Sequence, residues 1–104
     1  MTIQKDAGEL LAYAYNKYNE GNGINNTEFE EESKWEKQRI RNALTYLRDK
    51  GLVKATFFLG GNFYIERLYP TGIDIIENQE IFKDTFGFTI NLGVLQFSWQ
   101  KREE

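Results

Sequence analysis

The chain has 104 residues, of which 40% are hydrophobic and 15% aromatic, so we expect a single domain that buries one modest core. It contains no cysteine and no histidine, which excludes disulfides, thiol nucleophiles, imidazole metal ligands and histidine-based acid–base catalysis. The formal net charge of −3 disfavours long-range attraction to nucleic-acid phosphates, so a nucleic-acid partner would require a local basic surface.

The sequence also predicts the location of the protein and the absence of enzyme activity. The first residues, MTIQKDAGELLAYAY, lack a basic segment followed by a long apolar run, and no window approaches the roughly 20 apolar residues of a membrane span. We therefore expect a cytoplasmic protein with no membrane partner. The sequence shows no paired carboxylates that would suit catalysis, so we expect no enzyme activity, no cofactor and no metal.

A first helix is predicted over residues 6–19. Asp6 is placed to cap it or to favour its positive end, and Gly21 and Gly23 follow it in a segment that would stop the helix and turn the chain. Ile24 follows as an anchor or a very short strand. The spacing of apolar residues predicts one buried face, made of Ala7, Leu10, Leu11, Ala14, Tyr15 and Tyr18.

A second, acidic helix is predicted to begin near Glu28. Thr27 and Glu30 have the spacing of a capping box, and Phe29 is the one clear apolar anchor. The glutamates allow two interpretations, solvated first-turn charges or a metal site built from Glu28, Glu31 and Glu32. We favour the first, because adjacent carboxylates on a helix point in different directions.

The third helix, residues 35–50, is the most strongly patterned part of the chain. Ser33 and Glu36 repeat the capping-box spacing, and cationic residues outnumber acidic ones from Lys34 to Arg48. The predicted buried face contains Ile40, Ala43, Leu44 and Leu47. The opposite face is cationic and rich in hydrogen-bonding groups: Lys37, Gln38, Arg41, Asn42, Thr45 and Arg48, with Arg39 and Tyr46 near its edges.

A β-hairpin is predicted directly after this helix. Gly51 supplies the helix stop, and residues 53–69 are rich in aromatic and β-branched residues on both sides of Gly60-Gly61-Asn62. Because these three residues tolerate positive φ, we expect a short turn of a primed type. Pro70 closes the second strand.

The last part of the chain is expected to hold a helix and a strand. Thr71 would cap a short helix whose isoleucines 73, 75 and 76 face inward. Residues 87–102 alternate, with Phe88, Ile90, Leu92 and Val94 on one side of a strand and Leu95, Phe97 and Trp99 on the other. Such a strand either completes the sheet of its own chain or pairs with a second copy, and we favour a homodimer.

The order helix, short anchor, helix, helix, hairpin resembles the winged helix-turn-helix superfamily of DNA-binding domains. The resemblance covers roughly residues 6–79 and is carried by Leu44, Leu47, Gly51, Leu52 and Val53 at the junction of helix and hairpin. The segment Pro70-Thr71-Gly72-Ile73 resembles the start of the helix that often follows the wing. The resemblance implies an α+β fold, a winged helix (a three-helix bundle plus a hairpin wing) with an extra C-terminal helix and strand. Residues 1–80 would form the winged-helix domain including that extra short helix, and residues 81–104 would form a C-terminal extension that holds the strand and could serve in dimerisation.

The resemblance also implies a function. The third helix would enter the major groove of double-stranded DNA, as in a transcription regulator. Lys37, Gln38, Arg41 and Asn42 would meet base edges or phosphates, Thr45 would share that face, and Arg39 and Arg48 would meet phosphates.

Two features favour an alternative function. First, the hairpin tip Gly60-Gly61-Asn62 carries no cation, which leaves Lys54 and Arg67 for phosphate contact. Second, the glutamates from Glu28 onward would repel phosphate. The alternative is a protein–protein interaction module of the same fold that does not bind DNA.

Overall fold

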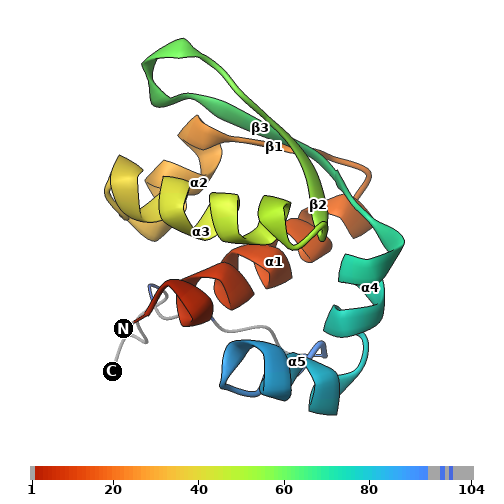
Figure 1. The fold of residues 1–104 in the computed structure, drawn as a ribbon. Helices are drawn as coiled ribbons and strands as arrows, with labels where there is room; N and C mark the ends of the chain where they lie inside the picture. Colours follow the sequence, from red (N-terminus) through yellow and green to blue (C-terminus); the bar gives the residue numbers. More distant parts are fainter. Residues whose placement is uncertain (1, 94–96, 98, 100–104) are drawn as a thin grey trace, which may run out of the picture.

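The computed structural model describes residues 2–93, 97 and 99, and over these residues the chain is α+β, as predicted (Figure 1). Its layout of helices and strands is compatible with that of a winged helix. None of the helices in the described residues is long and apolar enough to cross a membrane. In chain order the elements are α1 (Ile3–Asn19), β1 (Ile24–Asn25), α2 (Asn26–Ser33), α3 (Lys37–Asp49), β2 (Val53–Phe57), the 3-10 turn η1 (Leu59–Gly61), β3 (Phe63–Leu68), α4 (Pro70–Ile76) and α5 (Gln79–Phe86).

Helix α1 is the central element of the core. It contacts α3, β3, α4 and α5, and Figure 1 shows it crossing beneath α3. All nine residues from Asp6 to Ala14 are therefore buried, including two acidic ones. The prediction of a single buried face is wrong for this helix, because neighbours cover it on several sides. Tyr18, expected on that face, is 40% exposed.

The first two helices begin earlier than predicted and have different caps. The Thr2 hydroxyl caps α1 by accepting a hydrogen bond from the Lys5 amide at 3.1 Å, so Asp6 is not the cap. The Asn25 side chain caps α2 by accepting from the Glu28 amide at 2.9 Å, so Thr27 is not the cap either. In both helices a suitable oxygen stands one residue before the first turn, which satisfies a free amide there.

The caps predicted for the next two helices are also wrong. The buried Ser33 hydroxyl accepts from the Trp35 amide at 3.1 Å and does not cap α3, which begins at Lys37 without a side-chain cap. Thr71 lies inside α4, which begins at Pro70, a residue that needs no amide partner at a helix start. A Cβ on the buried Gly72 would lie 2.3 Å from the Leu52 carbonyl oxygen, so a glycine allows α4 to pack against that backbone.

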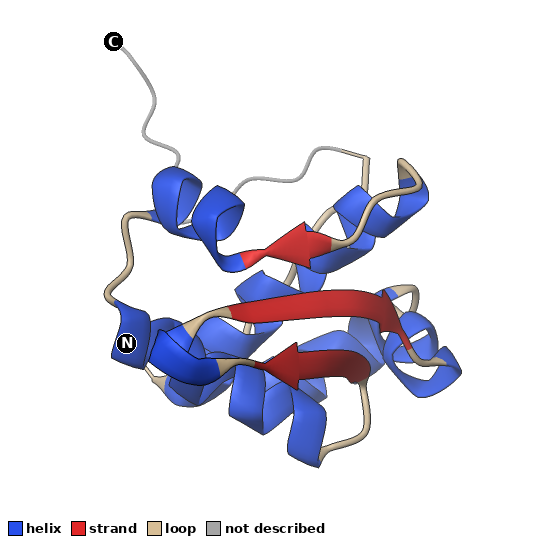
Figure 2. Ribbon diagram, turned by 90° about the horizontal axis from the view of Figure 1, so that it is seen from above, coloured by secondary structure: helices blue, strands red, loops and turns tan. Residues whose placement is uncertain are grey.

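The predicted hairpin is confirmed, but not its turn type. Strands β2 and β3 pair antiparallel, and β1 pairs with the other edge of β3, so that Ile24 lies in a very short strand (Figure 2). The predicted helix stop is confirmed, since Gly51 has φ +74° directly after α3. The hairpin tip is a 3-10 turn with positive φ at Gly60 and Gly61. The tip is therefore longer than a two-residue primed turn, although it uses both glycines as expected.

The C-terminal part differs most from the prediction. An unpredicted helix, α5, is capped by the Asn78 side chain and spans the predicted domain boundary at residue 80. Its Phe82 and Phe86 are fully buried. Residues 87–93 contain no strand, so the predicted strand is wrong there, and Val94 and Leu95 lie outside the described residues. Phe97 and Trp99 pack against the core of their own chain.

Candidate nucleic-acid interface

Helix α3 presents its predicted polar face to solvent. Ile40, Ala43, Leu44 and Leu47 are buried against the core, as the apolar spacing predicted. The rest of the helix surface has three parts, defined by its neighbours. One side faces the hairpin, the middle faces solvent, and the other side faces the start of α1. The charged side chains have different partners in each part.

On the hairpin side, two arginines lie over the same aromatic ring. The guanidinium carbons of Arg41 and Arg48 are 4.7 and 4.5 Å from the centre of the Phe57 ring. Residues seven apart lie two turns along the same stripe of a helix, and β2 places Phe57 beside that stripe. Neither arginine forms an ion pair with any residue that the structure describes. Both are exposed, so these are charges that a polyanion could reach.

Lys37, on the same side, already has a partner. Its ammonium lies 2.9 Å from a carboxylate oxygen of Glu30. The same oxygen accepts a weaker bond from Asn26 at 3.4 Å, so Glu30 serves these contacts and forms no capping box with Thr27. The pair is partly exposed, so its strength in water is low. Lys37 can therefore exchange Glu30 for a phosphate at small cost.

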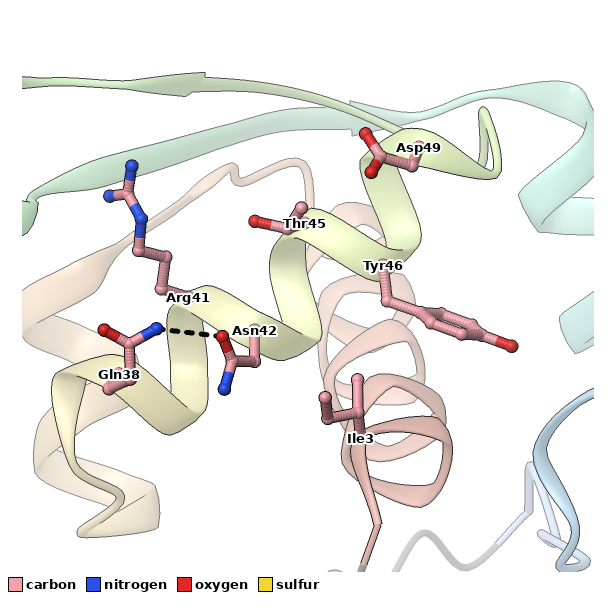
Figure 3. A pocket seen from close by; sticks show the side chains of 7 residues that line it. All are labelled: Ile3, Gln38, Arg41, Asn42, Thr45, Tyr46 and Asp49. Atoms are coloured by element: carbon pink, nitrogen blue, oxygen red, sulfur yellow. Dashed lines mark hydrogen bonds between the residues drawn. The ribbon is translucent and has the colours of Figure 1, made fainter.

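The middle of α3 carries amide and hydroxyl groups around a shallow hollow of about 320 Å³. Gln38 donates a hydrogen bond from Nε2 to Oδ1 of Asn42 at 2.9 Å, as Figure 3 shows. Thr45 lies farther along the same face. In Figure 3 Arg41 extends toward the strands, whereas the Tyr46 ring points away from them. The hollow is lined by Ile3, Gln38, Arg41, Asn42, Thr45, Tyr46 and Asp49.

Arg39, on the α1 side, is bound within the protein. Its Nε and one terminal nitrogen donate to the two carboxylate oxygens of Asp6 at 2.8 and 3.0 Å. Its guanidinium carbon lies 4.1 Å from the centre of the Trp35 ring. The Asp6 side chain is only 7% exposed, so this is a bidentate, largely desolvated ion pair. The geometry does not support the phosphate contact expected for Arg39, and we leave it out of the interface.

The glutamates of α2 lie in separate surroundings. Glu28 lies 2.9 Å from the Lys17 ammonium, and this hydrogen bond raises the pKa of Lys17. In the part of the chain that the structure describes, no group of three acidic residues is placed to hold a metal ion. The placement of Glu28, Glu31 and Glu32 therefore gives the metal alternative no support. Glu31 and Glu32 are exposed, as solvated charges are expected to be.

The hairpin adds little positive charge to this surface. The Lys54 ammonium lies 3.6 Å from the Glu66 carboxylate, with both side chains about half exposed, and Arg67 lies over Tyr69. The tip instead exposes apolar side chains, with Phe58 55% and Leu59 96% exposed. Arg67 is exposed and forms no ion pair among the described residues, so it is the hairpin cation that a polyanion could reach, and α3 supplies the larger share of such cations.

Two important residues were not predicted from the sequence. The Phe57 ring contacts both Arg41 and Arg48. The sequence feature that could have indicated this contact is a pair of arginines seven residues apart, followed by a strand that contains aromatic residues. Asp6 binds Arg39 from 33 positions away, and no local sequence pattern predicts such a partner.

Comparison of the chain with protein-family models, with curated proteins and with solved structures gives no match. The functional proposal therefore rests on this geometry.

Proposed function

We propose that this protein is a winged-helix DNA-binding protein, a transcription regulator that places the N-terminal half of α3 in the major groove. Arg41 and Arg48 bind phosphates, while Gln38, Asn42 and Thr45 face base edges. The observation that carries the proposal is the exposed pair of guanidinium groups on Phe57, without an ion-pair partner among the described residues.

The arrangement of elements supports the same proposal. Three helices precede a two-stranded hairpin, and the short β1 joins the hairpin through β3. In winged-helix domains this order leaves the third helix outermost, where it can enter a groove about 12 Å wide. Lys37 adds a third cation to the hairpin side of α3 when it exchanges Glu30 for a phosphate.

Titration of fluorescently labelled duplex DNA at several salt concentrations tests the proposal. The logarithm of the binding constant should fall linearly with the logarithm of salt concentration, because phosphate binding releases counterions. Arg41→Ala should weaken binding about tenfold and reduce the steepness of the salt dependence by about 1. Lys83→Ala, which removes an exposed cation from α5, is the matched control and should change neither. A binding constant that does not change with salt concentration, or an equal loss of affinity in Arg41→Ala and Lys83→Ala, would contradict the proposal.

A protein–protein interaction module is the second candidate function. It is favoured by one observation, the exposure of Phe58 and Leu59 at the hairpin tip, because exposed apolar side chains side by side are common at interfaces. A double variant, Phe58→Ser with Leu59→Ser, separates the two functions. It should leave DNA affinity within about twofold if α3 carries the binding.

The expected homodimer is a separate prediction. Phe97 and Trp99, which motivated it, contact Tyr13 of their own chain in edge-to-face geometry, with ring centres 5.9 and 6.2 Å from that of Tyr13. Light scattering at micromolar concentration tests the prediction. A mass near 12.2 kDa would show a monomer, and DNA binding would then require no palindromic site.

A further inference from the structure

The hydrogen bond between Gln38 and Asn42 fixes two exposed amides in one orientation. Both side chains stand in the middle of α3, one turn apart, with the Gln38 Nε2 to Asn42 Oδ1 distance at 2.9 Å. Neither amide has another hydrogen-bond partner among the described residues. An exposed pair of this kind adds little stability. Its effect is to fix the two amides relative to one another, with one polar atom of each left at the outer end of the bonded pair (Figure 3).

The remaining atoms form a defined pattern. Gln38 keeps its Oε1 as a free acceptor, and Asn42 keeps its Nδ2 as a free donor. If both amide groups are turned over, Asn42 donates to Gln38, and the pair again presents one acceptor and one donor. Either assignment of the amide nitrogen and oxygen atoms therefore leaves one acceptor and one donor, with Gln38 and Asn42 exchanging the two roles.

This pattern matches the major-groove edge of one base. Adenine presents an acceptor at N7 beside a donor at its 6-amino group, whereas guanine presents two acceptors, N7 and O6. We propose that Gln38 and Asn42 together read the adenine of an A·T base pair, a proposal that rests on the proposed DNA-binding function. Guanine at the same place would set its O6 against the free acceptor of the pair and leave that acceptor unsatisfied.

The surroundings of the pair suit this role. The hollow of about 320 Å³ beside Gln38 and Asn42 leaves space for a base edge in front of them. Arg41 lies on the next stripe of the helix and reaches toward the hairpin, where it is held over Phe57. A phosphate bound there would set the depth of α3 in the groove, and the two amides would then meet a base edge already oriented.

Selection of binding sites from a library of random duplex DNA tests this inference. The selected sites should share at least one A·T pair. Replacing that pair by G·C should weaken wild-type binding about tenfold, and replacing its adenine by 7-deazaadenine, which lacks N7, should weaken binding several-fold. Gln38→Ala and Asn42→Ala should each reduce the discrimination between A·T and G·C to about twofold or less. Both should keep the wild-type salt dependence, because neither residue binds phosphate.

The outcomes separate this inference from the function on which it rests. Salt-dependent binding with the same A·T preference in wild type, Gln38→Ala and Asn42→Ala would overturn the inference and leave DNA binding intact. Wild-type protein that does not bind DNA would overturn both. Lys83→Ala is the control for the preference, and thermal unfolding of the exposed Gln38 and Asn42 variants checks that they remain folded.

Discussion

Helix α3 carries arginines on two sides, and the two sides differ in whether a carboxylate lies beside the guanidinium group in addition to an aromatic ring. On the α1 side, Arg39 stacks on Trp35 and also binds the buried carboxylate of Asp6. On the hairpin side, Arg41 and Arg48 stack on Phe57 without a carboxylate from the described residues. An aromatic ring orients an arginine on either side. The carboxylate decides whether its charge serves the fold or remains free for a partner.

Breaking the ion pair between Asp6 and Arg39 should produce the largest change in stability. Asp6→Ala leaves the partly buried charge of Arg39 without its partner, and the expected cost is about 2–4 kcal/mol. Urea unfolding measures this cost. Arg39→Ala should cost as much or more, because Asp6 is the more deeply buried of the two, and the double variant should recover part of the loss. A loss no larger than that of Arg41→Ala would remove the difference between the two sides.

Phe57→Leu should separate binding from stability on the hairpin side. The half-buried ring can be replaced by leucine at a cost below about 1.5 kcal/mol. Arg41 and Arg48 then lose the surface that orients them, and DNA affinity should fall about fivefold, since an exposed cation–π contact contributes about 0.5–1 kcal/mol.

The matched control for Phe57→Leu is Tyr69→Leu, which removes the ring beneath Arg67 and should leave affinity unchanged. If Tyr69→Leu lowers affinity as much, the phosphates are bound by the hairpin and not by α3.

Tyr13→Phe tests the buried side without touching an arginine. The Tyr13 hydroxyl is buried and has no hydrogen-bond partner among the described residues, so its removal should stabilise the protein by about 1 kcal/mol. Burial raises the pKa of this hydroxyl above its ordinary value of 10.0, and the charge of Glu28 raises it further.

The sign of the pH dependence follows from this raised pKa. Above pH 10 the unfolded chain loses the tyrosine proton before the folded chain does, so wild-type stability should fall as pH rises from 10 toward 12. Urea unfolding over this range measures the effect, and Tyr13→Phe should show a smaller decline. An identical decline in both proteins would contradict the assignment to Tyr13, and DNA affinity at neutral pH should be unchanged in the variant.

Glu30→Gln should give the smallest effect, an increase in DNA affinity of about two- to threefold. The change releases Lys37 from a partly exposed ion pair whose strength is below about 1 kcal/mol, and it removes a negative charge beside the proposed phosphate contacts. Titration at low salt measures the increase. Glu66→Gln, which releases Lys54 on the hairpin, is the control and should change affinity less. Unchanged affinity in Glu30→Gln would exclude Lys37 from the interface.

The parts of the fold that could be predicted are those whose signals are local. The spacing of Ile40, Ala43, Leu44 and Leu47 predicted the buried face of α3, because side chains three and four residues apart share one face of a helix. Gly51 predicted the end of that helix, and Gly60 and Gly61 predicted the hairpin tip, because positive φ is accessible to glycine. The polar face of α3 was identified for the same reason.

Only the tertiary structure decided which polar residues of α3 are free and which element is central. Arg39 and Arg41 look alike in the sequence, yet Asp6 binds the first from 33 positions away. Helix α1 became the core of the molecule because α3, β3, α4 and α5 cover it, which no periodicity within α1 could show. Phe97 and Trp99, expected in a strand, fill that core instead. Local conformation follows from neighbouring residues, whereas burial and ion pairing follow from contacts between segments far apart in the chain.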